Sequence, residues 1–307
     1  MKIVIIGPGS MGLLIASKLA LAGNEPLLLD YRQERAERLN QTGIIYQNRQ
    51  DKQICRPKFI SQPRNLTNID ALIFCVKSYS LSQSLQFCQP LLERCSLALF
   101  MQNGISHLQP RRPDHVSAAF ASTTEGAYLV EPGHIYHAGQ GITKIGFLAN
   151  APEKSQRLLK ELITELNSSG LKSEESKTIE EVVWSKLLVN IGINGLTAIY
   201  NCTNGELLKR PEAQARMKRA VTEAEEVARA IGIKLPPDPL EQVRAVCRAT
   251  ENNISSMLQD IRAGRSTEIR AINVALLEIA TQHGIACPEN ALIVSEVLRK
   301  EALRLEL

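Results

Sequence analysis

The chain has 307 residues, enough for two ordinary domains whose hydrophobic cores need neither disulfides nor metals. Its 36 lysines and arginines exceed its 32 aspartates and glutamates by only four, and aromatic residues make up 4% of the chain. This composition argues against nucleic-acid binding, because it offers neither long basic blocks nor aromatic stacking platforms.

The cysteines and histidines predict no metal site. The seven cysteines are odd in number, and neither they nor the five histidines have metal-ligand spacing, so the cysteines are typical of reduced thiols in a cytosolic protein. A strand-like segment begins at Lys2, which leaves no room for a signal peptide, and no run of about 18 apolar residues is present. We therefore expect a soluble, cytoplasmic protein with no membrane partner.

The first half alternates between strand-like and helix-like segments. Strands are predicted at residues 2–6, 26–30, 71–76, 97–102 and 116–122. Helices are predicted at residues 10–23 and 31–40, and between the third and fourth strands. Such alternation predicts βαβ crossovers and a parallel sheet. Residues 133–147 are expected to form a hairpin that closes the sheet on one edge.

Strand signals stop after about Lys177. Helices are then predicted at residues 178–193, 211–231, 240–261, 267–283 and 288–305, separated by glycines and prolines. The expected fold class is therefore α/β, with a Rossmann-type parallel-sheet domain over residues 1–176 and an all-helical domain over residues 177–307. The amphipathic last helix suits either its own domain or a dimer contact, so we expect a monomer or a homodimer.

The first glycine-rich segment matches the pattern G-x-G-x-x-G. It consists of Gly7, Pro8, Gly9, Ser10, Met11 and Gly12. It follows the first predicted strand and opens the first predicted helix, which is the context that dinucleotide binding requires. Gly7 forms the tight turn, Gly9 lets the backbone approach a pyrophosphate, and Gly12 lets the helix pack on the strand. The N–H groups at the helix start attract the phosphates, so the segment predicts a dinucleotide cofactor.

The end of the second predicted strand is expected to read the adenosine ribose of that cofactor. Asp30 lies 18 residues after Gly12, where an acidic side chain bonds the ribose 2′-hydroxyl and favours NAD. Arg32 and Arg35 follow and are suited instead to the 2′-phosphate of NADP. A helix-capping role is a further alternative for Asp30. The sequence leaves the choice between NADP and NAD open.

A polar stripe follows one face of a helix-like stretch, WSKLLVNIGINGLTA, over residues 184–198. Lys186, Asn190 and Asn194 fall four apart among apolar residues and therefore share a face. Asparagine is a poor helix former, so two asparagines in mid-helix carry a cost that a solvated surface would not require. The stripe therefore favours a binding cleft, although a solvated face is the ordinary interpretation of Lys186 taken alone.

Together with GPGSMG and this stretch, three further segments give the sequence a resemblance to the ketopantoate reductase (2-dehydropantoate 2-reductase) family. They are VKSY at residues 76–79, QNG at 102–104 and NNISSMLQDIRAGRSTEI at 252–269. The resemblance covers nearly the whole chain. It implies NADPH-dependent reduction of 2-dehydropantoate to pantoate, a step toward pantothenate and coenzyme A. The alternatives are a reductase of a different 2-oxo acid and a non-catalytic NADPH sensor.

The resemblance also implies roles for particular residues. Lys186 is implied to be the catalytic acid, and Glu268 to complete the site. Lys77 and Asn103 are implied to face the cofactor and the cleft, and Thr124 to lie at its rim. The residues implied to hold the substrate are Asn190, Asn194, Asn253 and Ser256.

Lysine suits the acid role on chemical grounds. Hydride transfer to a ketone creates an alkoxide, and a donor already aimed at the oxygen lowers the cost of that charge. The reference pKa of lysine is about 10.4, so efficient acid catalysis favours a lowered pKa. A partly dry cleft and a nearby oxidised nicotinamide would both lower the pKa of Lys186.

Some positions depart from the family or have a simpler explanation. Arg270 stands where the family commonly has aspartate, and Val274 where it has glycine, which keeps a different 2-oxo acid as an alternative. Asn253 and Ser256 are expected to share one helix face because they are three residues apart. Glu268 lies at a predicted helix start, where its position alone favours a capping role.

Overall fold

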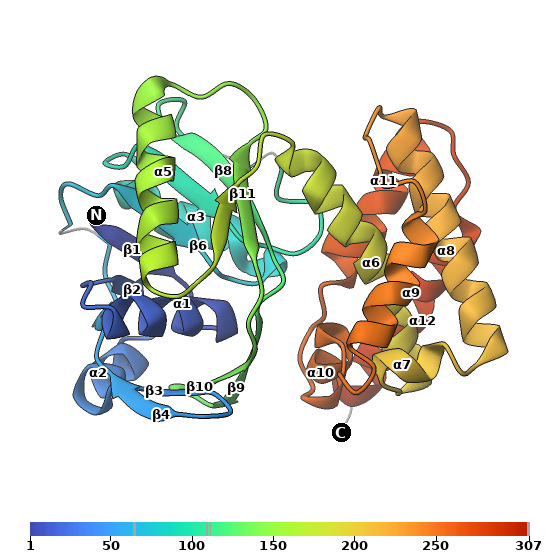
Figure 1. The fold of residues 1–307 in the computed structure, drawn as a ribbon, viewed down its shortest axis with the longest axis horizontal. Helices are drawn as coiled ribbons and strands as arrows, with labels where there is room; N and C mark the ends of the chain where they lie inside the picture. The colour runs from blue at the N-terminus through green and yellow to red at the C-terminus, as the bar shows by residue number, and fades with distance from the viewer. Residues whose placement is uncertain (64–65, 109, 111, 306–307) are drawn as a thin grey trace. The chain divides into compact units, whose positions relative to one another are not determined.

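The structure, a computed structural model, describes residues 1–63, 66–108, 110 and 112–305, with no side-chain description for 304 and 305. The chain divides into two compact units, drawn in Figure 1. One, here called the sheet unit, contains Met1–Gln102 and Leu108–Ile179. The other, here called the helical unit, contains Asn103–His107 and Glu180–Leu307. Five residues from the middle of the chain therefore group with the C-terminal part.

An eight-stranded sheet forms the centre of the sheet unit, in the order β12-β11-β8-β7-β6-β1-β2-β5. Its strands are β1 (Ile3–Ile6), β2 (Leu27–Leu29), β5 (Lys58–Ile60), β6 (Ala71–Phe74), β7 (Leu97–Phe100), β8 (Ser117–Thr123), β11 (Thr143–Phe147) and β12 (Ser173–Glu175). Every neighbouring pair is parallel except β8 with β11. The predicted α/β class is confirmed. The strand order reverses at β1, and open α/β sheets bind ligands beyond the carboxyl ends of strands at such a point.

Alternating side chains of the central strands enter two different parts of the core. Ile3, Ile5 and Ile73 pack with apolar residues of the helices α1 (Ser10–Leu21) and α5 (Glu153–Ser168). On β6, β7 and β8, Phe74, Phe100 and Phe120 stack in sequence, with ring centroids 5.1 and 5.7 Å apart. Strands buried on both faces read as continuous apolar runs, which is why these segments were predictable.

The other helical segments of the sheet unit are short. They are α2 (Gln33–Thr42), the 3-10 turn η1 (Ser78–Ser80), α3 (Leu81–Phe87) and α4 (Gln89–Leu92). Helix α5, which was not predicted from the sequence, packs against α1, β7 and β12. Its buried leucines, Leu159, Leu162 and Leu166, follow helical spacing in a segment rich in charged residues.

A second sheet has four strands in the order β4-β3-β10-β9. Its strands are β3 (Ile44–Gln47), β4 (Lys52–Cys55), β9 (Gly126–Glu131) and β10 (His134–Gly139). The prediction of a hairpin over residues 133–147 is wrong, because β10 pairs with β9 and β3 whereas β11 joins the large sheet. The tight turn lies one strand earlier, at Gly133, whose φ of +93° suits glycine. These strands are short and partly exposed, so their periodicity is weak.

The described part of the helical unit contains helical segments and connections, as predicted. The segments are α6 (Ile179–Tyr200), α7 (Asn204–Leu207), α8 (Pro211–Ala230), α9 (Pro239–Ala249), α10 (Ser256–Arg262), the π-helical turn η2 (Arg270–Val274), α11 (Ala275–Gln282) and α12 (Pro288–Leu305). The prediction of one helix over residues 240–261 is wrong. Ser255 caps a new helix by accepting a 3.1 Å hydrogen bond from the Leu258 N–H.

Among the described residues, α6 is the helix that is long and apolar enough to cross a bilayer by length and composition. Its most apolar 18-residue window is 67% buried inside the protein, and core helices pass the same test. Gly192 and Gly195 show how closely α6 is packed. A Cβ atom at these positions would crowd Val243 and Ile293, respectively. We therefore interpret α6 as the central core helix of the helical unit.

Candidate active site

The phosphate-loop candidate lies directly after the buried strand β1. Its first glycine, Gly7, has a φ of +100°, and a Cβ at Gly12 would collide with the carbonyl oxygen of Gly7. At Gly9 the nearest atom to such a Cβ is 3.9 Å away, so the backbone there is accessible. No side chain caps the start of α1, and its first turn holds no acidic residue. The helix therefore keeps its N–H groups and positive dipole available for an anion, so this loop fits the phosphates of a dinucleotide.

The remaining loop residues continue this turn, and the end of β2 lies beside it, since the Gly7 N–H donates a 3.2 Å hydrogen bond to the carbonyl of Leu29. Pro8, Ser10 and Met11 are all partly exposed. Beyond β2, Asp30 is completely buried and forms an ion pair with Arg35. One Asp30 oxygen also accepts hydrogen bonds from Arg35 Nη2 at 2.7 Å and from the Arg32 N–H at 3.0 Å. Both carboxylate oxygens are engaged, and the bond to Asp30 raises the pKa of Arg35.

Arg32 remains exposed beside that ion pair. Its Nε donates a 3.1 Å hydrogen bond to the hydroxyl of Tyr31, and its guanidinium lies 5.5 Å from the centre of the Tyr31 ring. The Tyr31 side chain is itself exposed. The end of β2 therefore presents a cationic group and an aromatic face, whereas the acidic group is buried and paired.

Lys77 and Thr124 also belong to the sheet unit. Lys77 is partly exposed and lies directly before the turn η1, three residues after the end of β6. Thr124 is exposed, and its hydroxyl accepts a 2.9 Å hydrogen bond from the N–H of Ile142. Thr124 therefore joins the segments that follow β8 and precede β11.

In the helical unit, α6 carries the predicted polar stripe. Lys186 and Asn190 are partly exposed, and Asn194 is only 8% exposed. The adjoining residues Leu187 and Ile191 are buried in the core. The stripe is thus neither a solvated face nor part of the apolar core, which is the environment expected of a binding surface.

Glu268 lies next to this stripe at the other end of the sequence. It is 5% exposed, and its carboxylate accepts a 2.9 Å hydrogen bond from the side-chain amide of Asn103. Burial lowers the pKa of Lys186 to about 8, and the negative charge of Glu268 works against this decrease. The Glu268 carboxylate therefore bonds Asn103 and interacts electrostatically with Lys186. This side chain does not act as a helix cap, which was the alternative interpretation.

The structure also brings Asn103 and His107 into this cluster. Asn103 was predicted to lie with the cofactor-binding residues, whereas in the structure it belongs to the helical unit. His107, to which sequence reasoning assigns no chemistry, is 2% exposed. Burial lowers its pKa to about 4, with Glu268 opposing and Lys186 reinforcing the shift. Its position three residues after the QNG motif is the only sequence signal for this placement.

Asn253 and Ser256 do not share a helix face, which corrects the expectation from their spacing. Asn253 lies in the connection between α9 and α10, and Ser256 is the first residue of α10. Both are exposed, and the neighbouring Ser255 is buried and accepts a 2.7 Å hydrogen bond from the hydroxyl of Thr197 on α6. This bond ties the connection to α6 within one turn of Asn194, the last residue of the polar stripe.

The two departures from the family pattern lie in and around η2. The guanidinium of Arg270 is 3.8 Å from the carboxylate of Glu301 on α12, and its side chain is 66% exposed. Val274 is partly exposed and ends the π turn. Arg270 therefore has a partner on a neighbouring helix. In the described ranges, no group of three His, Cys, Asp or Glu side chains is placed to hold a metal ion.

Comparisons with known proteins cover both units. The family model described as ketopantoate reductase PanE/ApbA matches residues 3–150, and the corresponding C-terminal model matches residues 178–301. A protein of Halobacterium salinarum named 2-dehydropantoate 2-reductase is 32% identical, over 94% of this chain and 95% of its own.

Solved structures show the same fold. A PanE/ApbA family ketopantoate reductase from Ralstonia eutropha is 26% identical and covers 99% of this chain and 100% of its own, with a TM-score of 0.87. The ternary structure of D-mandelate dehydrogenase with NADH and anilino(oxo)acetate has a TM-score of 0.89. It is 27% identical and covers 99% of both chains.

Proposed function

Because the chain belongs to the ketopantoate reductase family, we propose that it reduces 2-dehydropantoate to pantoate with NADPH. It is an oxidoreductase acting on a CH–OH group, in the synthesis of pantothenate. The observation that carries the proposal is the buried carboxylate of Glu268, held by a 2.9 Å hydrogen bond from Asn103 and close enough to Lys186 for its charge to act on the pKa of that lysine. We assign cofactor binding to residues 1–176 and substrate binding and catalysis to residues 177–307. We further propose a cytoplasmic protein that acts as a monomer or homodimer, without a nucleic-acid or membrane partner.

Lys186 acts as the general acid. The reduced nicotinamide, when bound, supplies a hydride to the ketone carbon of the substrate. The Lys186 ammonium donates a hydrogen bond to the ketone oxygen and then gives a proton to the alkoxide. A pKa of about 8 suits this step, because the lysine is mostly protonated at neutral pH and yet releases its proton readily. Glu268 keeps the pKa of Lys186 from falling further.

The polar stripe and the connection before α10 hold the substrate. Asn190 and Asn194 each offer an amide donor and an amide acceptor, which suits a molecule with hydroxyl, ketone and carboxylate groups. Asn253 and Ser256 are exposed and add further hydrogen-bonding groups. Asn103 orients Glu268 through their 2.9 Å hydrogen bond.

NADP is the preferred cofactor, with NAD as the alternative. The loop Gly7–Gly12 holds the pyrophosphate, while Lys77 and Thr124 line the remaining cofactor surface. Arg32 supplies the cation for the 2′-phosphate of NADP. Asp30, the residue that would favour NAD, is buried and paired with Arg35, which weakens its ability to bind a ribose 2′-hydroxyl.

A different 2-oxo acid is the second candidate substrate. The likeness to D-mandelate dehydrogenase favours it, because that solved protein shares the fold and was captured with a substituted oxoacetate. Arg270 does not favour a different 2-oxo acid, because its exposed side chain lies near Glu301. A sensor without turnover would have no need of Lys186 and its polar stripe.

One assay separates these functions. Oxidation of NADPH is followed with 2-dehydropantoate and with a panel of other 2-oxo acids, at equal concentrations. The proposal predicts the highest kcat/KM with 2-dehydropantoate. A higher value with another acid would reassign the substrate. Binding of NADPH without turnover of any acid would instead favour the sensor.

A further inference from the structure

The turn that carries Glu268 has an unusual backbone. Residues Arg270–Val274 form a π-helical turn, η2, which begins two residues after Glu268. Such turns insert a residue into a helix and occur frequently at functional sites. The carbonyl of Ala271 in this turn accepts a 3.1 Å hydrogen bond from the N–H of Ile105, two residues after Asn103. The turn therefore holds both Glu268 and the segment that supplies its hydrogen-bond donor.

Glu301 on the helix α12 binds the segment directly before this turn. The Glu301 carboxylate accepts a 2.7 Å hydrogen bond from the N–H of Thr267 and a second hydrogen bond from the Thr267 hydroxyl. The same hydroxyl accepts a 3.2 Å hydrogen bond from the N–H of Ile269. Glu301 therefore fixes the residue directly before Glu268, and its ion pair with Arg270 adds a contact on the other side.

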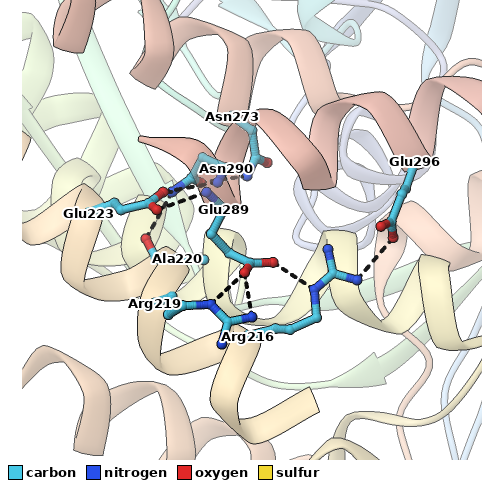
Figure 2. Close-up of polar contacts among 8 residues, drawn as sticks. All are labelled: Arg216, Arg219, Ala220, Glu223, Asn273, Glu289, Asn290 and Glu296. Carbon is cyan, nitrogen blue, oxygen red and sulfur yellow. Dashed lines mark hydrogen bonds and ion pairs between the residues drawn. The ribbon is translucent and has the colours of Figure 1, made fainter. Parts of the chain in front are cut away.

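Asn290 on the same helix binds the other end of the turn. Asn273 and Asn290 are completely buried, and the Asn273 side-chain amide donates a 2.9 Å hydrogen bond to the Asn290 carbonyl oxygen. Asn290 in turn donates to the carbonyl of Ala220 at 3.0 Å and to Glu223 at 2.7 Å (Figure 2). Glu223 also accepts the N–H groups of Glu289 and Asn290 and so secures the start of α12.

We propose that α12 is a positioning element of the active site, in which Glu301 and Asn290 hold the turn of residues 267–274 from both ends. Neither residue touches the reacting groups. They act through Glu268, by keeping its carboxylate against Asn103 and near Lys186. The Asn273 side-chain oxygen is buried without a hydrogen-bond partner in the described part of the chain, so the bond to Asn290 is the one that holds this side chain. The network resists displacement, because a buried member that moves leaves its partners without hydrogen bonds. This role rests on the proposed function, since it assumes that Glu268 serves catalysis.

The test compares Glu301→Ala with Glu296→Ala. Glu296 is a matched control because it lies on the same helix and forms a 3.0 Å ion pair with Arg216, away from the turn (Figure 2). The first measurement is amide hydrogen exchange of residues 267–274, which needs neither cofactor nor substrate. We expect faster exchange there in Glu301→Ala and wild-type exchange in Glu296→Ala. Glu301→Gln should restore protection partly, because its amide oxygen still accepts the Thr267 N–H.

The second measurement is the pH profile of kcat/KM. When Glu268 is displaced, it raises the pKa of Lys186 less, so the high-pH limb should move to lower pH by roughly half a unit or more. The value of kcat/KM should also fall roughly 10- to 100-fold in Glu301→Ala, a loss typical of small misplacements at an active site. Glu296→Ala should leave the high-pH limb of the kcat/KM profile at the wild-type pH, although the variant should be less stable.

The outcomes separate this inference from the proposed function. Unchanged exchange and an unchanged pH limb in Glu301→Ala would overturn the inference while wild-type turnover stands. If the wild type turns over no 2-oxo acid, the proposed function fails, and the exchange data still decide whether α12 holds the turn. Should Glu301→Ala fail to fold, Thr267→Val takes its place. It removes the two hydrogen bonds of the hydroxyl, to Glu301 and from the Ile269 N–H, but keeps the bond from the Thr267 N–H to Glu301 and nearly preserves the shape of the side chain.

Discussion

Asn103 donates a hydrogen bond to the carboxylate of Glu268, which lies 165 positions later in the chain. This contact brings the QNG motif to the TEI segment within the helical unit. It places the Glu268 charge where it raises the pKa of Lys186 against the effect of burial. Removal of any one of these three side chains is therefore expected to change the position or the pKa of the other two.

Lys186→Met should remove the general acid while keeping the apolar stem of the side chain. We expect kcat to fall by about 10²- to 10⁴-fold, the usual contribution of a positioned acid. The Kd of NADPH should remain near the wild-type value, because the phosphate loop belongs to the sheet unit. Steady-state kinetics and fluorescence titration measure the two quantities. Exposed Lys218 on α8 provides the control, Lys218→Met. Near-normal kcat in Lys186→Met would remove this lysine from the mechanism.

The pH dependence of the wild type should show the titration of Lys186. The acid form is the active one, so kcat/KM should decrease as the pH rises through about 8. Glu268→Gln removes the charge that raises this pKa, so the decrease should begin at lower pH. Glu278→Gln, an exposed change on α11, should leave the profile unaltered. A profile that is flat between pH 7 and 9 would contradict the assignment.

Local patterns in the sequence predicted those parts of the proposed site that lie within one element. The loop Gly7–Gly12 was recognisable because a buried strand precedes it and a helix follows it. The stripe of Lys186, Asn190 and Asn194 was recognisable because helical periodicity fixes which residues share a face. Both features depend on neighbours a few residues away, which the sequence displays directly.

The remaining parts depend on contacts between distant segments. The pairing of Asn103 with Glu268 and the hold of Glu301 on Thr267 join residues far apart in the chain, so no local pattern contains them. Asn253 was misplaced because its neighbours have helical periodicity on both sides of a break. That break is set by the cap at Ser255 and its bond to α6.

The end of β2 should determine the choice between NADPH and NADH. Arg32→Ala should weaken NADPH binding roughly 10- to 100-fold, equivalent to a charge-assisted hydrogen bond of about 1.5–3 kcal/mol, and leave NADH binding nearly unchanged. Arg35→Ala should uncover the charge of Asp30 and shift the ratio of the two Kd values toward NADH. Fluorescence titrations with both cofactors measure these constants without substrate.

Arg38→Ala is the control for these variants, because Arg38 is exposed on the same helix, α2. It should leave both Kd values close to those of the wild type. Equal losses of NADPH and NADH affinity in Arg32→Ala would show that this residue does not read the 2′-phosphate. An unaltered Kd ratio in Arg35→Ala would show that the ion pair with Asp30 does not set the preference.

Gly104→Ala should break the contact between the QNG segment and the π turn. Gly104 has a φ of +80°, and a Cβ there would collide with the carbonyl oxygen of Ala271. The hydrogen bond from Ile105 to that carbonyl should be lost, and Asn103 should move away from Glu268. Backbone strain of this kind costs about 1–3 kcal/mol, and each kcal/mol lowers Tm by roughly 2–4 °C in a domain of this size. We therefore expect both a lower Tm and a lower kcat.

Gly232→Ala separates the clash from the strain. Gly232 has nearly the same φ, +81°, but no atom lies within 4 Å of the position that its Cβ would take. It should therefore lose stability from the backbone conformation alone and keep wild-type kcat. Differential scanning calorimetry and steady-state kinetics compare the two variants. If both lower kcat equally, or neither does, the contact between Gly104 and Ala271 does not position the active site.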